Sequence, residues 1–285
     1  MCGRYRLSRR AEILAAYDAE YEGMDWDARY NIAPTQSAPV IRQDPKQPIR
    51  RASLMRWGLV PHWAKDSTIG ARMINARAET AAEKPAFKES LGRRRCLVPA
   101  DGFYEWSRNG KSKQPYCFEL HERQPFAFAG LWDRWRARDG NCLETCTILT
   151  TTLNQLLADI HDRMPVILSP PHYDLWLDPG FRDVEEITAM LTPFKAGQMR
   201  RYPVSEYVNN VANDDPIVLG SNPVIAACAS PPFLTAKANS TISSLKNKST
   251  PKARSIPRCL GSAALFPAPR HRSCRRCWAR WPCST

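Results

Sequence analysis

The sequence predicts an α+β protein whose main domain is built on a curved, largely antiparallel β-sheet. Two observations lead to this fold class. Short runs rich in Val, Ile, Leu and aromatic residues follow one another closely between residues 38 and 151, and turn residues separate them. Helical patterns are few, and they lie before and after this run of strands. The chain of 285 residues is long enough to bury a substantial core.

Each element follows from local residue patterns. Strands are expected at 38–42, at 51–60, within 94–106 on both sides of an Asp-Gly turn, and at 114–121, 125–132 and 143–151. Helices are expected at 8–18 with Ser8 as N-cap, at 153–159, at 170–177 behind a Ser169 cap, and at 184–192.

The charge divides the chain into two parts. The net charge is +13, but the 223–285 segment has eleven Lys and Arg and no acid, so it carries most of this excess. Its Ser, Lys, Pro and Thr content predicts a disordered basic tail after a folded domain of residues 2–222. Such a tail is typical of loose nucleic-acid binding, and its Cys274-x-x-Cys277 spacing is at most half a zinc site.

The chain lacks the features of a membrane or secreted protein. No apolar run approaches the ~20 residues that span a bilayer, and the N-terminus has no signal-peptide pattern. The ten cysteines are therefore expected to be reduced thiols in a cytoplasmic protein, nucleoid-associated when it acts on DNA.

The chain opens with "MCGRY". Removal of Met1 would leave Cys2 with a free α-amine and a thiol, which titrate near pKa ~8 and ~8.5. Such a 1,2-aminothiol condenses with an aldehyde to a thiazolidine, and it can also act as a nucleophile in acyl transfer. The simpler alternative is a small buried residue at the start of a strand.

Other stretches concentrate reactive side chains. In "MINARAET", Asn75, Arg77 and Glu79 alternate and would project from one face of an extended segment. In "DGFYEW", Glu105 lies among aromatic residues, where burial raises a carboxyl pKa, although a surface carboxylate fits the pattern equally well. His161 in "DIHDRMPVIL" is either a structural histidine or an acid/base.

The ordered set "MCGRY", "RYNIAPTQ", "WGLVPHWAK", "INARAET", "PADGFYEW" and "DIHDRMPVIL" resembles the SOS-response-associated peptidase family, the abasic-site processing proteins. "YPVSEYVNNV" resembles that family's closing motif, and the resemblance runs from Cys2 to about residue 219. It implies a barrel-like sheet with flanking helices, a monomer, and a basic channel for single-stranded DNA and single-strand/double-strand junctions. It also implies a thiazolidine crosslink with the aldehyde of an abasic site and weak lyase activity. Independently of the resemblance, chemistry on an aldehyde needs no metal, nucleotide or flavin, and the sequence offers no convincing site for any of them.

The resemblance assigns roles residue by residue. Cys2 would be the nucleophile, Asn75 would position the opened sugar, Glu105 would relay protons, and His161 would be a general acid/base on the sugar oxygen. The DNA contacts would be phosphate contacts by Arg4, Arg77 and Arg163, stacking or wedging by Pro34 and Trp63, and a polar contact by Thr150.

Three other functions remain open. A thiol peptidase or self-processing hydrolase could use Cys2, His161 and Glu105 without DNA. A glutamine amidotransferase also begins Met-Cys-Gly, but it would leave "INARAET" and "IHDR" unexplained. A plain nucleic-acid-binding protein driven by the basic tail would lose binding if 223–285 were deleted.

Overall fold

The computed structural model describes residues 2–21, 26–44, 47, 49–107 and 113–220. By its contacts the chain divides into Met1–Pro232 and Phe233–Thr285, and every described residue belongs to the first unit. The predicted disordered tail and its Cys274 and Cys277 therefore lie outside the described residues. Within the part described, no helix is long and apolar enough to cross a membrane.

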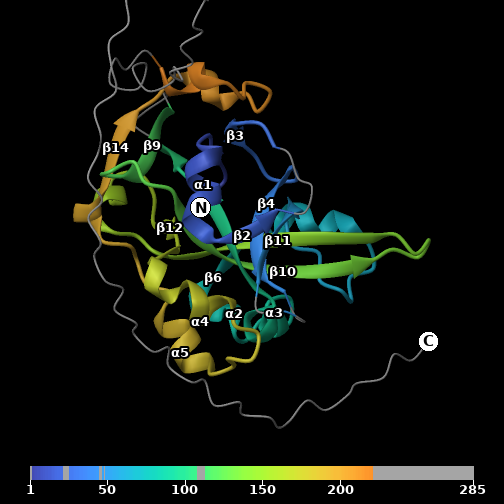
Figure 1. Cartoon of the computed structure of the whole chain (residues 1–285). Helices are drawn as coiled ribbons and strands as arrows, with labels where there is room; N and C mark the ends of the chain where they lie inside the picture. The colour runs from blue at the N-terminus through green and yellow to red at the C-terminus, as the bar shows by residue number, and fades with distance from the viewer. Residues whose placement is uncertain (1, 22–25, 45–46, 48, 108–112, 221–285) are drawn as a thin grey trace, which may run out of the picture. The chain divides into compact units, whose positions relative to one another are not determined.

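The structure is α+β, as predicted, with mostly short elements (Figure 1). The strands are β1 (Tyr5–Leu7), β2 (Ala19–Tyr21), β3 (Arg29–Ile32), β4 (Ser37–Gln43), β5 (Arg50–Trp57), β6 (Asn75–Arg77), β7 (Arg95–Ala100), β8 (Gly102–Ser107), β9 (Gln114–Leu120), β10 (Phe126–Arg136), β11 (Cys142–Thr152), β12 (Arg163–Pro165), β13 (Ile167–Leu168) and β14 (Met199–Pro203). The α-helices are α1 (Arg10–Tyr17), α2 (Ala78–Ala81), α3 (Lys88–Arg93), α4 (Tyr173–Leu177) and α5 (Val184–Ala189). The 3₁₀ helices are η1 (Ser67–Arg72), η2 (Gln155–Leu157), η3 (Pro170–His172), η4 (Ala196–Gln198), η5 (Glu206–Asn209) and η6 (Pro216–Leu219).

The larger sheet closes on itself. Its order is β12-β11-β10-β7-β4-β5-β2, and β11 also pairs in parallel with β5, at Thr145 with Arg56 and at Cys146 with Trp57. A closed ring therefore forms from strands β11, β10, β7, β4 and β5. The β11–β5 pairing in this ring is parallel, and the remaining pairings are all antiparallel. This confirms the curved, barrel-like sheet, and closure protects these strands from edge pairing.

The second sheet has the order β14-β9-β8-β1-β3 and carries the N-terminus. The expected hairpin around the Asp-Gly pair is wrong, because β7 and β8 belong to different sheets. Asp101 is a fully buried corner between them. A Cβ on Gly102 would lie 3.1 Å from the Cys117 Sγ and 3.2 Å from the Arg6 Nη2, so a larger residue would have to push these side chains aside by a few tenths of an ångström.

Asp101 also explains why Ser8 is not the N-cap of α1. Its carboxylate accepts hydrogen bonds from the backbone N–H groups of Ser8 at 2.7 Å and Arg9 at 2.9 Å, and from the Ser8 hydroxyl. The N-cap residue is Arg9, which makes no side-chain capping bond. A carboxylate from a distant strand thus supplies the negative charge that favours a helix N-terminus.

Four other predicted elements differ in length or type. The 51–60 strand ends at Trp57, because Gly58 has a φ of +129° and turns the chain. The 153–159 helix is only the 3₁₀ helix η2, and the 184–192 helix ends at Ala189. The 170–177 helix is η3 followed by α4, and Ser169 occupies the cap position without a side-chain hydrogen bond.

An aromatic cluster fills the space between the two sheets. Tyr5 packs edge-on against Trp57 and Phe128, with ring centroids 5.3 and 5.8 Å apart. Phe103 stacks on Phe118 at 5.0 Å and meets Phe128 at 6.0 Å. All five rings are at most 1 % exposed, so removing one of the phenylalanines would cost about 3–5 kcal/mol. This core holds β1 rigidly, and Cys2 lies just ahead of β1.

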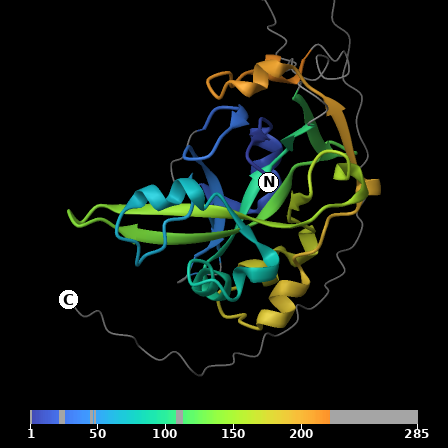
Figure 2. The same cartoon turned by 180° about the vertical axis from the view of Figure 1, so that it is seen from behind.

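Two peripheral features complete the domain. In Figure 1, β10 and β11 form a long hairpin, and Figure 2 shows the segment containing η1 beside it. The segment with η5 and η6 packs on the second sheet through Tyr104, Val208 and Val218.

Candidate active site

Cys2 is the centre of the candidate site. Its side chain is fully buried, and it precedes β1, which pairs with β8 through Tyr5 and Phe103. The backbone N–H of Tyr104 donates to the Arg4 carbonyl oxygen at 3.0 Å, which continues this pairing toward Cys2 and Glu105. Burial raises the pKa of the Cys2 thiol, and the nearby Glu105 carboxylate raises it further. The thiol is therefore neutral at rest and needs a base.

Glu105 is suited to that role. It lies on β8 with only 4 % of its surface exposed, so the alternative of a surface carboxylate is wrong. Burial raises its pKa to about 7, and Asp162 adds a further upward contribution. A carboxyl group with a pKa near neutrality can both take up and release a proton at physiological pH.

Asn75 connects β6 to the N-terminus. Its Nδ2 donates a hydrogen bond to the Cys2 carbonyl oxygen at 2.8 Å, and β6 is held beside β11 by parallel pairing of Asn75 with Ile148. The Asn75 Oδ1 is buried and has no hydrogen-bond partner among the residues that the structure describes. A buried acceptor without a partner costs about 1–3 kcal/mol, which a bound ligand that donates a hydrogen bond would recover.

His161 follows η2 and lies beside two charged residues. The backbone N–H of Arg163 donates to its Nδ1 at 3.1 Å, which in the neutral ring assigns the proton to Nε2. An Asp162 carboxylate oxygen is 2.7 Å from the same Nδ1. Asp162 also acts on the Glu105 pKa, so the His161 segment lies on the Glu105 side of the domain. The His161 Nδ1 thus lies beside both a backbone N–H donor and a carboxylate oxygen.

Arg163 is held firmly on β12. Its Nη2 donates to the Glu79 Oε2 at 2.8 Å and to the Thr150 carbonyl oxygen at 2.7 Å, and its Nε reaches the Thr150 hydroxyl at 3.3 Å. Thr150 is fully buried and also bonds the Ala76 carbonyl oxygen. In this conformation the Thr150 hydroxyl therefore positions Arg163 and is not open to solvent.

Arg4 is tied to the C-terminal part of the domain. Its Nη1 donates to the Asn31 Oδ1 at 2.7 Å and to the Val208 carbonyl oxygen at 2.9 Å, and its guanidinium lies 5.8 Å from the Trp106 ring centre. Partial burial lowers its pKa. Asn31 donates to the Val208 carbonyl in turn. Arg4 thus joins the "RYNIAPTQ" and "YPVSEYVNNV" motifs.

The remaining predicted DNA contacts are more open to solvent. Trp63 is 53 % exposed, and its loop is anchored by the His62 N–H donating to Asp133 at 3.0 Å. Arg77 on β6 is exposed, and Pro34 is half-buried in a turn where Thr35 has a φ of +71°. These side chains are accessible to a large ligand without any rearrangement.

Two features of the site were missed from the sequence. The expected single face of Asn75, Arg77 and Glu79 is wrong for Glu79, because the chain enters α2 at Ala78 and leaves the extended conformation. The Asn31 side chain makes four hydrogen bonds with distant residues, which no local pattern indicates. The sequence pointed to Glu79 and Asn31 only in that each lies within one of the motifs named above, "MINARAET" and "RYNIAPTQ".

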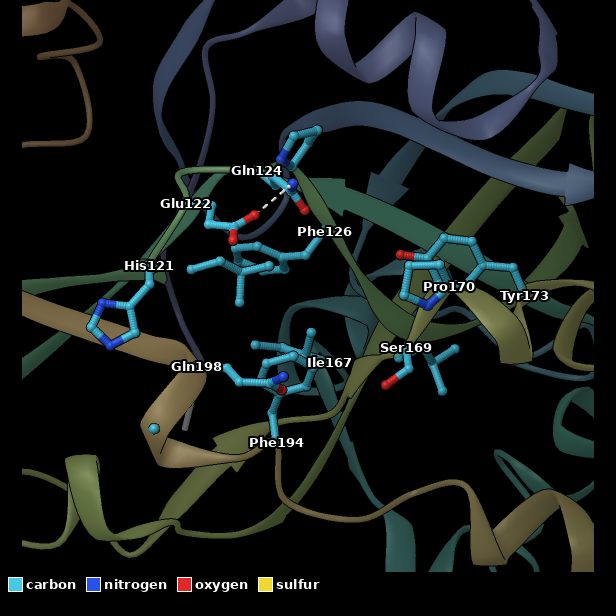
Figure 3. A pocket seen from close by; sticks show the side chains of 14 residues that line it. His121, Glu122, Gln124, Phe126, Ile167, Ser169, Pro170, Tyr173, Phe194 and Gln198 are labelled. Carbon is cyan, nitrogen blue, oxygen red and sulfur yellow. Dashed lines mark hydrogen bonds between the residues drawn. The ribbon is translucent and has the colours of Figure 1, made fainter.

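A separate cavity of about 400 Å³ lies beside the β9–β10 turn (Figure 3). Phe126, Ile167 and Phe194 contribute apolar walls, and Gln124 donates to Glu122 at 2.9 Å near its rim. None of its lining residues belongs to the predicted site. Among the described residues, no group of three or more His, Cys, Asp or Glu side chains is arranged to hold a metal ion.

The sequence and the fold of this chain match those of known proteins. The model of the family described as SOS response associated peptidase (SRAP) matches residues 1–211. The chain belongs to this family. It is 44 % identical over 227 residues to the abasic site processing protein YoqW of Bacillus subtilis strain 168, covering 78 % of this chain and all of that relative.

Two further similar proteins have lower sequence identity to this chain. The abasic site processing protein HMCES of Gallus gallus is 33 % identical over 258 residues, which cover 76 % of each chain. A crystal structure of a protein from Bacteroides thetaiotaomicron superposes with a TM-score of 0.69 at 29 % identity, covering 77 % of this chain and 99 % of that one. The fold of this SRAP-family chain is therefore shared with solved structures.

Proposed function

We propose that this protein processes abasic sites in single-stranded DNA by forming a covalent crosslink through Cys2. The observation that carries the proposal is the convergence of Cys2, Asn75 and Glu105, with the Asn75 amide bonded to the Cys2 carbonyl at 2.8 Å and the Glu105 pKa near 7. The names of the relatives, abasic site processing proteins, support the same substrate.

The chemistry needs no oxidant or reductant. After Met1 is removed, the α-amine of Cys2 attacks the aldehyde carbon of the ring-opened sugar, and loss of one water molecule gives a Schiff base. The thiol then adds to the C=N carbon, its proton passes to the nitrogen, and a five-membered thiazolidine closes. The same Schiff base also permits β-elimination, which accounts for an associated lyase activity.

Glu105 and His161 each carry out a different proton transfer, and Asn75 binds the sugar. Glu105 accepts a proton from the amine or the thiol and returns it to the departing water. His161 protonates the sugar ring oxygen that must open to release the aldehyde. The free Oδ1 acceptor of Asn75 receives a hydrogen bond from a sugar hydroxyl, while its Nδ2 keeps the Cys2 backbone in place.

The DNA strand follows exposed and basic side chains. Arg77 and Arg163 attract phosphates, and Trp63 offers an aromatic face on which an unpaired base can stack. Stacking of this kind tolerates any base, which suits a protein that recognises a lesion and not a sequence.

The test is a denaturing gel with a single-stranded oligonucleotide that contains one abasic site. The wild-type chain should give a heat-resistant shifted band, and an intact oligonucleotide should give none. Cys2→Ala should abolish the band although the other nine cysteines remain. Cys142→Ala removes an exposed cysteine and should leave the band unchanged.

Mass spectrometry of the band checks that Met1 is absent and that the added mass equals the cleaved or intact strand minus one water. No band from protein whose Met1 is removed would refute the crosslinking proposal. Amide hydrolysis that depends on Cys2 and needs no DNA would then favour the thiol peptidase.

A further inference from the structure

Glu79 forms an ion pair with Arg163, an arginine that the proposed function assigns to a DNA phosphate. Its two carboxylate oxygens accept hydrogen bonds from the Arg163 Nη2 at 2.8 and 3.2 Å. Glu79 is about half exposed, whereas the Arg163 side chain is only 12 % exposed. The solvent-facing side of Arg163 is therefore covered by a carboxylate that can itself turn into water.

Glu79 also lies close to a second arginine of the proposed DNA channel. Partial burial is the largest single influence and raises the Glu79 pKa, but the hydrogen bond from Arg163, a backbone hydrogen bond and the charges of Arg163 and Arg77 together lower it below its ordinary value. Glu79 is thus fully ionised at neutral pH between two arginines. The local charge of this trio is half of what the two arginines alone would present to DNA.

We propose that Glu79 competes with DNA phosphate for Arg163 and so limits the reversible affinity of the protein for undamaged single strands. The inference rests on the proposed function, because it assumes that DNA passes Arg77 and Arg163. A phosphate that approaches Arg163 exchanges one charge-assisted hydrogen bond for another, and the net gain is small. Stable attachment is then left to the covalent bond at Cys2.

The anchoring of Arg163 makes this competition specific. Thr150 holds the guanidinium from behind through its carbonyl oxygen at 2.7 Å, so Arg163 stays in place when Glu79 turns away. Replacing Glu79 by Gln removes the negative charge and keeps the size of the side chain. The variant should offer DNA an additional cationic contact without releasing Arg163.

The experiment measures reversible binding of the full-length Cys2→Ala protein to an intact fluorescent oligonucleotide by anisotropy. Glu79→Gln should tighten binding about fivefold to tenfold at low salt. The slope of log K against log salt should steepen by about 0.7, the value for one added phosphate contact on a single strand. Glu83→Gln removes an exposed carboxylate four residues further on and should bind like the parent protein.

A second substitution distinguishes competition from simple support of Arg163. Arg163→Gln should cancel the gain from Glu79→Gln in the double variant, and thermal melting confirms that each variant is folded. Weaker or unchanged DNA binding by the folded Glu79→Gln variant would overturn the inference, because Glu79 would then only hold the Arg163 side chain in position. The outcome is independent of crosslinking: a salt-dependent gain without an abasic crosslink would sink the proposed function and leave this inference standing.

Discussion

Replacing Glu105 by Gln should make the protein more stable at alkaline pH than the wild type, and the difference should shrink toward pH 5. Glu105 has a pKa of about 7 in the folded protein against an ordinary value of 4.5, because it is buried on β8. The folded state therefore retains a proton that the unfolded state has already lost. Between these two pKa values the unfolded state binds fewer protons, so stability falls as pH rises and levels off above pH 7.

The magnitude follows from the shift. Each pKa unit corresponds to about 1.4 kcal/mol, so the full difference is roughly 3 kcal/mol. Between pH 5 and pH 8 the wild type should lose about 2–3 kcal/mol of unfolding free energy that Glu105→Gln does not lose. Gln preserves the shape of the side chain and cannot ionise.

Urea denaturation of both proteins at pH 5 and pH 8 measures this difference, with equal m-values as the check that the transition is unchanged. Glu122→Gln removes an exposed carboxylate and serves as the matched control. Parallel pH dependence of wild type and Glu105→Gln would refute the reasoning, because Glu105 would then titrate normally and could not act as the neutral-pH proton relay.

Two further predictions concern packing and DNA contact. Gly102→Ala should lower the unfolding free energy by about 1–3 kcal/mol, because the new methyl group contacts Cys117 and Arg6. Gly197→Ala is the control, since the space around Gly197 is open and the unfolding free energy should not fall. Urea denaturation of the two variants measures the difference. Trp63→Ala should weaken reversible binding of single-stranded DNA by about 1–3 kcal/mol per stacked base without changing the melting temperature, because the ring is 53 % exposed. Anisotropy and thermal melting test this together, and an equal loss of affinity in Leu54→Ala would show that the Trp63 effect is not stacking.

Much of the fold was predictable from local patterns. The strands at β4, β9 and β11 follow alternating or continuous apolar runs, and their bounds agree with the expected ranges to within one residue at each end. Side-chain periodicity is a local property, so it can be read without knowing the partners of a strand. Helix ends were less predictable, because the cap of α1 comes from Asp101, more than ninety residues away.

The candidate site was predictable to the extent that its residues lie in motifs. Cys2, Asn75 and Glu105 were named from the sequence, and the structure brings together the segment ahead of β1, strand β6 and strand β8. The partners of these residues were not predictable. Glu79 was expected on the strand face of Asn75, and the turn into α2 carries it to Arg163 instead.

The sequence by itself determined which chemistry is available: an N-terminal thiol, a carboxyl group between aromatic residues, and arginines at motif positions. Only the tertiary structure decided the protonation and pairing of these groups. Burial of Glu105 and the Glu79–Arg163 ion pair both depend on segments that are distant in the chain and meet only when the strands close around the core. The shift of a pKa and the formation of an ion pair are set by local dielectric and distance, and both depend on neighbours that only the folded chain brings together.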